Sequence, residues 1–357
     1  MGARPPTKFG SMPAANPSSA DRSSVDVVLA GGGVRGIALM GAAETLAEAG
    51  YDFKRVAGSS AGAIVGALLA AGLPAGRMAA VMRGLDYRRS ADRGALGRLP
   101  LIGDGLSILL ENGIYEGDYL REWLGNELAA LGVETFADLA YDDDGADPTL
   151  PADHRYRLVV TVTDVTLGQL LRLPWDYRRA FGRDPNTELV VDAVRASTSV
   201  PFLYEPVTLS DLSTGRVSTL VDGGVLLNFP VETFDRRDGR PPRWPTFGVD
   251  LVGDSPPGGS ALFRPRWLPR LKPVALLESL ITTLVVGHDQ TVLAEPCVAQ
   301  RLIRVDTGEV GFADFGLPAA ARAELYRAGQ SAAASFLARW DWGAYLRGPC
   351  GARPVNP

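Results

Sequence analysis

The pentapeptide Gly-Ser-Ser-Ala-Gly at residues 58–62 constrains the fold of this chain more than any other stretch. Before it, residues 51–57 alternate apolar and polar side chains as a strand does, and after it the run 61–71 favours a helix that Gly72 would end. A serine between two glycines at a strand-to-helix junction is typical of a nucleophile elbow, which exposes a serine hydroxyl. We therefore predict Ser60 as a nucleophile with Gly58 and Gly62 shaping the turn; an incidental serine in a glycine-rich turn would give the same pattern.

A second glycine-rich turn, Gly-Gly-Gly-Val-Arg-Gly at residues 31–36, follows the apolar strand predicted for 25–30 and precedes a helix predicted for 37–49. Because the first three residues carry no side chain, their backbone N–H groups can point into a site at the start of a helix. Such an arrangement suits an oxyanion hole, which stabilises the negative charge that develops during acyl transfer.

The roles within this turn divide between hydrogen-bond donors and residues that shape it. The expected donors are the backbone N–H groups of Gly32, Gly33 and Val34. Gly31 and Gly36 are expected to shape the turn. Arg35 is expected either to steady the loop or a lipid phosphate, or to form an ordinary surface ion pair.

A third motif lies at the end of the strand predicted for residues 218–222, where Asp222 is followed by Gly223 and Gly224. The order and spacing of the three motifs resemble the patatin-like phospholipase family, whose catalytic machinery is a Ser–Asp dyad without a histidine. The resemblance runs from about residue 25 to 342 and includes the stretches 161–169, 193–207 and 314–333.

The resemblance implies a three-layer α/β/α fold with a mainly parallel central sheet. It also implies a lipid acyl hydrolase of the phospholipase A or lysophospholipase type, acting through an acyl-enzyme on Ser60 with Asp222 as the general base and no metal or organic cofactor. An ordinary aspartate, with a pKa of about 3.9, is a weak base. We therefore expect an apolar, partly desolvated site to raise the pKa of Asp222.

Three other interpretations fit parts of the sequence. The turn at 31–36 also matches the dinucleotide-binding pattern G-x-G-x-x-G, but the second strand ends in the serine elbow where that fold needs an acid for the ribose. A catalytically silent lipid-binding module of the same fold is a further alternative. The third is a catalytic triad, because His288 would follow Ser60 and Asp222 in the Ser–Asp–His order of α/β-hydrolases, whereas His154 precedes Asp222. An α/β-hydrolase normally has more strands before its serine than this sequence has, which favours the dyad.

Composition excludes some classes of protein. With 36 basic and 41 acidic residues in 357, the chain has a net charge of −5, which argues against nucleic acid as a partner. The two cysteines, Cys297 and Cys350, are too few for a disulfide framework and are expected to be ordinary thiols.

We expect one patatin-like domain at residues 25–345 between a disordered tail at 1–24 and a C-terminal tail at 346–357. No apolar run is long enough for a transmembrane segment, and the N-terminal stretch lacks the apolar core of a signal peptide. The sequence thus predicts a cytoplasmic protein whose partner is a lipid or phospholipid substrate.

Residues 255–275 combine arginines with Phe263 and Trp267 among prolines and glycines. Cationic side chains favour anionic headgroups, and tryptophan favours the membrane interface. This stretch predicts peripheral contact with a membrane, although a solvated loop whose aromatic side chains pack on the core would have the same composition.

Overall fold

A computed structural model describes most of the chain. The described residues are 23–86, 89, 117–141, 154–201, 203–236, 238, 240–253, 293–312 and 314–351. The strands are β1 (Ser23–Leu29), β2 (Tyr51–Gly58), β3 (Leu158–Asp164), β4 (Gln169–Leu173), β5 (Val207–Ser210), β6 (Val217–Asp222), β7 (Thr246–Val252) and β8 (Leu302–Asp306). The α-helices are α1 (Ile37–Glu48), α2 (Ala61–Ala70), α3 (Ala75–Gly84), α5 (Asp118–Ala129), α6 (Tyr177–Phe181), α7 (Val190–Ser197), α10 (Pro296–Ala299), α11 (Ala319–Leu337) and α12 (Trp342–Arg347). Short 3-10 turns are η2 (Gly33–Gly36), η5 (Phe136–Leu139), η7 (Pro185–Thr187) and η8 (Gly223–Val225).

The strands form one mixed sheet in the order β5-β6-β3-β2-β1-β7-β8, with β4 paired to β3. Neighbours from β3 through β2, β1 and β7 to β8 are parallel. The pairs β3–β4, β3–β6 and β5–β6 are antiparallel. Because parallel strands need crossover connections, the helices between them lie on the faces of the sheet.

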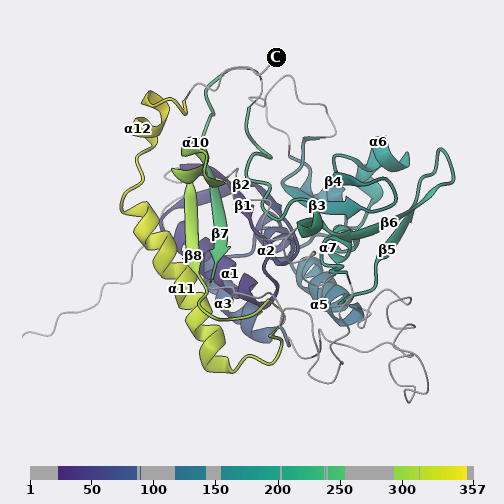
Figure 1. Ribbon diagram of the computed structural model, residues 1–357, viewed down its shortest axis with the longest axis horizontal. Coiled ribbons are helices and arrows are strands. Elements are labelled where there is room, and N and C mark those ends of the chain that lie inside the picture. The colour runs from purple at the N-terminus through teal and green to yellow at the C-terminus, as the bar shows by residue number, and fades with distance from the viewer. Residues whose placement is uncertain are drawn as a thin grey trace, which may run out of the picture.

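The central strands β1, β3 and β7 are buried on both faces, as their apolar residues require. In β1, Val27 and Leu29 belong to the large core that α1, α2 and α11 share, whereas Val28 lies in a second cluster with Phe229 and Val298. Figure 1 shows α11, in yellow-green, running beside β8 and across α1. The predicted fold class is confirmed: a mainly parallel sheet is flanked by helices.

Most elements predicted around the motifs are present. The two strands and two helices of the first seventy residues occur in the expected order as β1, α1, β2 and α2, and the strands near 155–174 form the β3–β4 hairpin. Asp164 supports this hairpin, because its carboxylate accepts hydrogen bonds from the backbone N–H groups of Thr166 and Leu167 at 2.9 and 3.1 Å. The stretch 255–275 and His288 lie outside the described residues.

The expectation of two ordinary thiols is wrong. Cys297 in α10 and Cys350 after α12 form a disulfide with their Cα atoms 5.2 Å apart. The two cysteines are 53 residues apart in the sequence, and only the packing of the C-terminal segment beside α10 brings them together. Cys350 is buried and lies beyond residue 345, where the sequence analysis places the end of the domain.

Within the described ranges, the structure contains no helix that is both long and apolar enough to cross a membrane.

Candidate active site

The register of the sheet brings the ends of the three predicted motifs to one level. Gly58 pairs with Leu29 on one side and with Val160 on the other. Asp222 pairs with Val162, two residues further along β3. Ser60, two residues beyond Gly58, is therefore level with Asp222 although β3 separates their strands.

Ser60 has the geometry of a sharp strand-to-helix turn. Its φ of 52° makes it the one non-glycine residue with positive φ among those described. Its side chain is buried, and its backbone N–H donates a hydrogen bond of 2.9 Å to Oγ of Ser197. Both flanking glycines are needed, because a Cβ at Gly58 would lie 2.3 Å from the carbonyl oxygen of Gly62 and one at Gly62 would lie 2.4 Å from that of Leu29.

Asp222 carries a buried carboxyl beside Ser60. Its Oδ1 accepts a 2.7 Å hydrogen bond from the N–H of Gly224, whereas Oδ2 has no partner with hydrogen-bond geometry among the described residues. Burial raises the pKa of Asp222 to about 7, against a smaller lowering by the side chain of Ser60 and by Gly224. The Ser60 hydroxyl thus lowers the pKa of the carboxyl although no hydrogen bond of regular geometry joins the two side chains, and the expected rise in pKa is present.

The residue that follows Asp222, Gly223, must be a glycine because its backbone packs directly against β3. A Cβ at this position would lie 2.4 Å from the carbonyl oxygen of Thr161 in β3. The short η8 turn therefore fits closely against β3 and holds Gly224 under the carboxyl of Asp222.

In the loop at residues 31–36, the three N–H groups predicted as oxyanion donors differ in whether they already have an acceptor. No described residue accepts a hydrogen bond from the N–H of Gly32 or Gly33. The N–H of Val34, however, donates to the carbonyl of Phe312 at 3.1 Å, so in this structure Val34 is not available as a donor and that prediction is corrected. The competing acceptor comes from the loop between β8 and α11, which local sequence could not reveal.

Gly31 and Arg35 hold this loop in place. The N–H of Gly31 donates to the carbonyl of Asn228 at 3.1 Å, and a Cβ at Gly31 would come within 3.3 Å of the Cβ of Ser60. Nε of Arg35 donates to the carbonyl of Gly32 at 3.3 Å. Burial lowers the pKa of Arg35, with Asp250 acting in the opposite direction, so the side chain steadies the loop rather than lying free on the surface.

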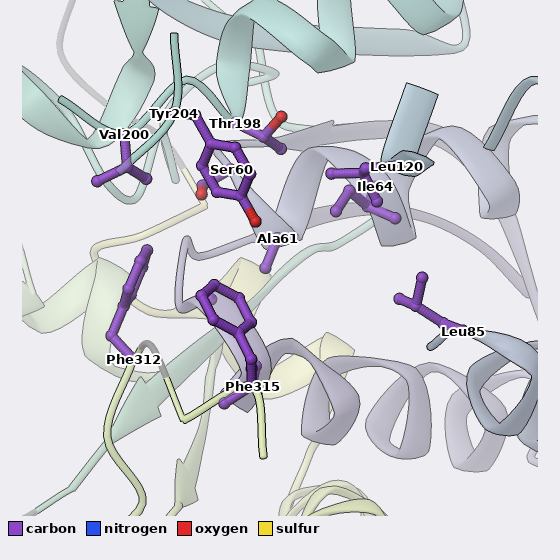
Figure 2. A pocket seen from close by; sticks show the side chains of 12 residues that line it. Ser60, Ala61, Ile64, Leu85, Leu120, Thr198, Val200, Tyr204, Phe312 and Phe315 are labelled. Atoms are coloured by element: carbon purple, nitrogen blue, oxygen red, sulfur yellow. The ribbon is translucent and has the colours of Figure 1, made fainter. Parts of the chain in front are cut away.

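A largely apolar pocket opens beside Ser60 (Figure 2), with a volume of about 440 Å³ including the part open to solvent. Ser60, Ala61 and Thr198 lie along one side of it, and the rings of Phe312 and Phe315 lie opposite. The other side chains that line it are Val34, Ile64, Leu85, Leu120, Val200 and Tyr204. A cavity of this composition suits an acyl chain better than a polar head group.

Comparison with known proteins identifies the family. The family model described as patatin-like phospholipase matches residues 27–235, more than half of the chain. The protein YqhO of Bacillus subtilis (strain 168) is 33% identical over 324 residues, which is 89% of this chain and 99% of YqhO. The chain belongs to the patatin-like phospholipase family. Proteins of this family act on lipids, so membership supports a lipid hydrolase.

Two solved structures of bacterial proteins are also similar to this patatin-like phospholipase. VipD from Legionella pneumophila matches with a TM-score of 0.49 and 18% identity, covering 89% of this chain and 67% of VipD. ExoU of Pseudomonas aeruginosa, in its complex with SpcU, matches with a TM-score of 0.42 and 19% identity, covering 89% of this chain and 52% of ExoU. The chain thus spans about half the length of ExoU.

Several residues of this patatin-like site had no role assigned from sequence. Ser197 lies in the stretch 193–207, which resembles the family. Phe315 lies in the second such stretch, 314–333, and Phe312 lies just before it. The N–H of Ala61, the first residue of α2, has no described acceptor, and Ala61 lines the same pocket. Among the described part of the chain, no histidine lines the pocket, and His154 instead stacks on Trp175 with ring centroids 4.1 Å apart.

Proposed function

We propose that this chain is a serine acyl hydrolase that cleaves carboxylic esters of lipids through an acyl-enzyme on Ser60. The observation that carries the proposal is the buried Asp222 carboxyl, with its pKa raised to about 7, beside a strained serine at the edge of an apolar pocket. A base is most effective when its pKa lies near the working pH.

In the first half-reaction Ser60 Oγ attacks the ester carbonyl carbon while its proton passes to Oδ2 of Asp222, the carboxylate oxygen without a hydrogen-bond partner among the described residues. The negative charge on the former carbonyl oxygen is stabilised by the N–H groups of Gly32 and Gly33 and by that of Ala61. The tetrahedral intermediate then breaks its bond to the alcohol, which leaves with the proton from Asp222.

In the second half-reaction water attacks the acyl-enzyme and gives its proton to Asp222. Collapse of the second tetrahedral intermediate returns that proton to Ser60 Oγ and releases the carboxylic acid. The proton that the alcohol takes away is replaced by the proton that water supplies, so a single buried carboxyl can act as base and then as acid in both steps.

A fluorophosphonate probe tests the nucleophile directly. We expect the wild-type protein to be labelled at Ser60 alone, as mapped by peptide mass spectrometry, and to hydrolyse a short nitrophenyl ester. Ser60→Ala should abolish both signals, and Asp222→Asn should lower kcat by about 10³ or more, because an amide cannot accept the proton. A folded wild-type protein without labelling at Ser60 would instead favour the silent lipid-binding module.

Peripheral contact with a membrane through residues 255–275 belongs to this proposal. Changing Trp267 to Ala together with Arg264, Arg266 and Arg270 to Ser should weaken cosedimentation with anionic vesicles and leave hydrolysis of a short ester unchanged. A charge-matched control replaces Arg322, Arg327 and Arg339 by Ser. Equal loss of vesicle binding in both variants would indicate general charge attraction and contradict a specific interface.

A further inference from the structure

We infer that the turn formed by residues 197–199, at the end of α7, sets the position of Ser60 relative to Asp222, and that Ser197 is a positioning residue for the reaction. The inference rests on the proposed function, since it concerns the same two side chains. It assigns a task to a segment whose residues are not the nucleophile, the base or the expected oxyanion donors.

One end of the turn holds the nucleophile. Oγ of Ser197 accepts the 2.9 Å hydrogen bond from the backbone N–H of Ser60, and Ser197 is fully buried. A serine with positive φ persists only where its surroundings favour that conformation. The hydroxyl of Ser197 does this, and it also takes the N–H of Ser60 out of the set of oxyanion donors.

The other end of the turn holds the base. The backbone N–H of Asp222 donates to the carbonyl of Ser199 at 2.9 Å. Ser60 and Asp222 lie on strands that are not neighbours, because β3 runs between β2 and β6. The two hydrogen bonds therefore join the nucleophile and the base through three consecutive residues, a shorter connection than the path across the sheet.

Arg195 makes the turn rigid. Its Nη1 donates to Oγ of Ser199 at 2.6 Å, and its Nη2 donates to the carbonyl of Glu205 at 3.1 Å. The hydroxyls of Thr198 and Ser199 both donate back to the carbonyl of Arg195, at 3.1 and 2.9 Å. Every hydroxyl of the segment is thus engaged, and the Arg195 side chain is itself buried.

A turn held on both sides in this way is expected to act on the rate of the chemical step rather than on substrate binding. Loss of the Ser197 hydroxyl would leave the pocket unchanged but let Ser60 shift relative to Asp222 and to the oxyanion donors. A misplacement of about 1 Å can cost on the order of 10²-fold in rate.

The test compares Ser197→Ala with Ser218→Ala. Ser218 is a fully buried serine in β6 whose hydroxyl has no hydrogen-bond partner among the described residues, so its removal makes a similar cavity without losing a bond. For each variant we would measure kcat and KM on a short soluble ester, the rate of fluorophosphonate labelling, and the melting temperature.

For Ser197→Ala we expect kcat and the labelling rate to fall together by about 10- to 100-fold, with KM changed by less than about threefold. The pH midpoint of the activity should stay close to that of the wild type, because burial, the main cause of the raised pKa of Asp222, is unaltered. Ser218→Ala should keep wild-type values of kcat and labelling. Ser197→Cys, which keeps a weaker acceptor of similar shape, should lie between wild type and Ser197→Ala, and this order decides the matter if the alanine variant does not fold.

Equal kcat in Ser197→Ala and Ser218→Ala, or a loss confined to KM, would overturn the inference. Such a result with normal labelling of wild-type Ser60 would leave the proposed function intact. A wild-type protein that the probe does not label would overturn the proposed function, whatever the Ser197 variants do.

Discussion

At the scale of single residues, the raised pKa of Asp222 predicts that kcat/KM increases with pH. As the base, Asp222 must be ionised, so kcat/KM should rise with pH and reach half of its maximum near pH 7, where burial places the pKa. An ordinary aspartate would give a midpoint about three units lower. The measurement is a pH profile with a soluble ester, for which Asp222→Asn provides the background. A wild-type midpoint close to pH 4 would contradict a buried base.

The same residue should cost stability at neutral and alkaline pH. The folded protein holds the proton of Asp222 with a pKa of about 7, against the ordinary value of 3.8 in the unfolded chain. The protonated carboxyl is therefore favoured by folding, and its contribution is fully present below about pH 4 and lost as pH rises through about 7.

Asp222→Asn should consequently gain stability over wild type as the pH increases. At most about 4 kcal/mol separates the two ends of this range, from about three pKa units at 1.36 kcal/mol each. Urea unfolding of both proteins at about pH 5 and about pH 8 measures the difference. A gap between the variants that is the same at both pH values would show that the carboxyl is not desolvated.

At the scale of secondary-structure elements, α1 and α11 cross with almost no space between their backbones. A Cβ at Gly329 of α11 would lie 1.9 Å from the carbonyl oxygen of Ala38, and one at Gly41 of α1 would lie 2.1 Å from that of Tyr326. The helix that follows the glycine-rich loop at residues 31–36 is thus fixed by direct backbone contact with α11.

Gly329→Ala should therefore destabilise the protein by about 1–3 kcal/mol, as overpacking in a core does. The matched control is Gly125→Ala in α5, where a Cβ would meet no atom within 4 Å. There the gain in helix propensity should stabilise by about 0.5–1 kcal/mol. Denaturant unfolding of both variants measures the two effects, and destabilisation of equal size in both would contradict the close crossing.

At the scale of the whole molecule, the disulfide between Cys297 and Cys350 closes the C-terminal part of the fold. By loop-closure entropy, a cross-link across 53 residues contributes up to about 4 kcal/mol. Cys297→Ser, Cys350→Ser and the double variant should all lose the same stability in urea unfolding, because each removes the same bond. The bond would be shown not to form if a thiol reagent titrated two thiols in the denatured wild-type protein without reduction. Losses of stability that add up in the double variant would show the same.

The sequence alone determined the fold class and the order of the elements around the three motifs. It also singled out Ser60 and Asp222, which the sheet brings to one level. These features depend on neighbours in sequence: glycines where another backbone approaches, and alternating or helical patterns of apolar residues. The roles of the two side chains in catalysis stay predictions.

Only the tertiary structure decided which hydrogen bonds join distant segments. In the folded chain the N–H of Val34 donates to the carbonyl of Phe312, and the N–H of Ser60 donates to Oγ of Ser197. The fold also pairs the two cysteines that the sequence analysis expected to be separate thiols. Each of these partners comes from another crossing of the chain, so its choice depends on strand register and helix packing. Local residue patterns carry no information about either, because the same glycine turn or serine could meet any acceptor that the fold places beside it.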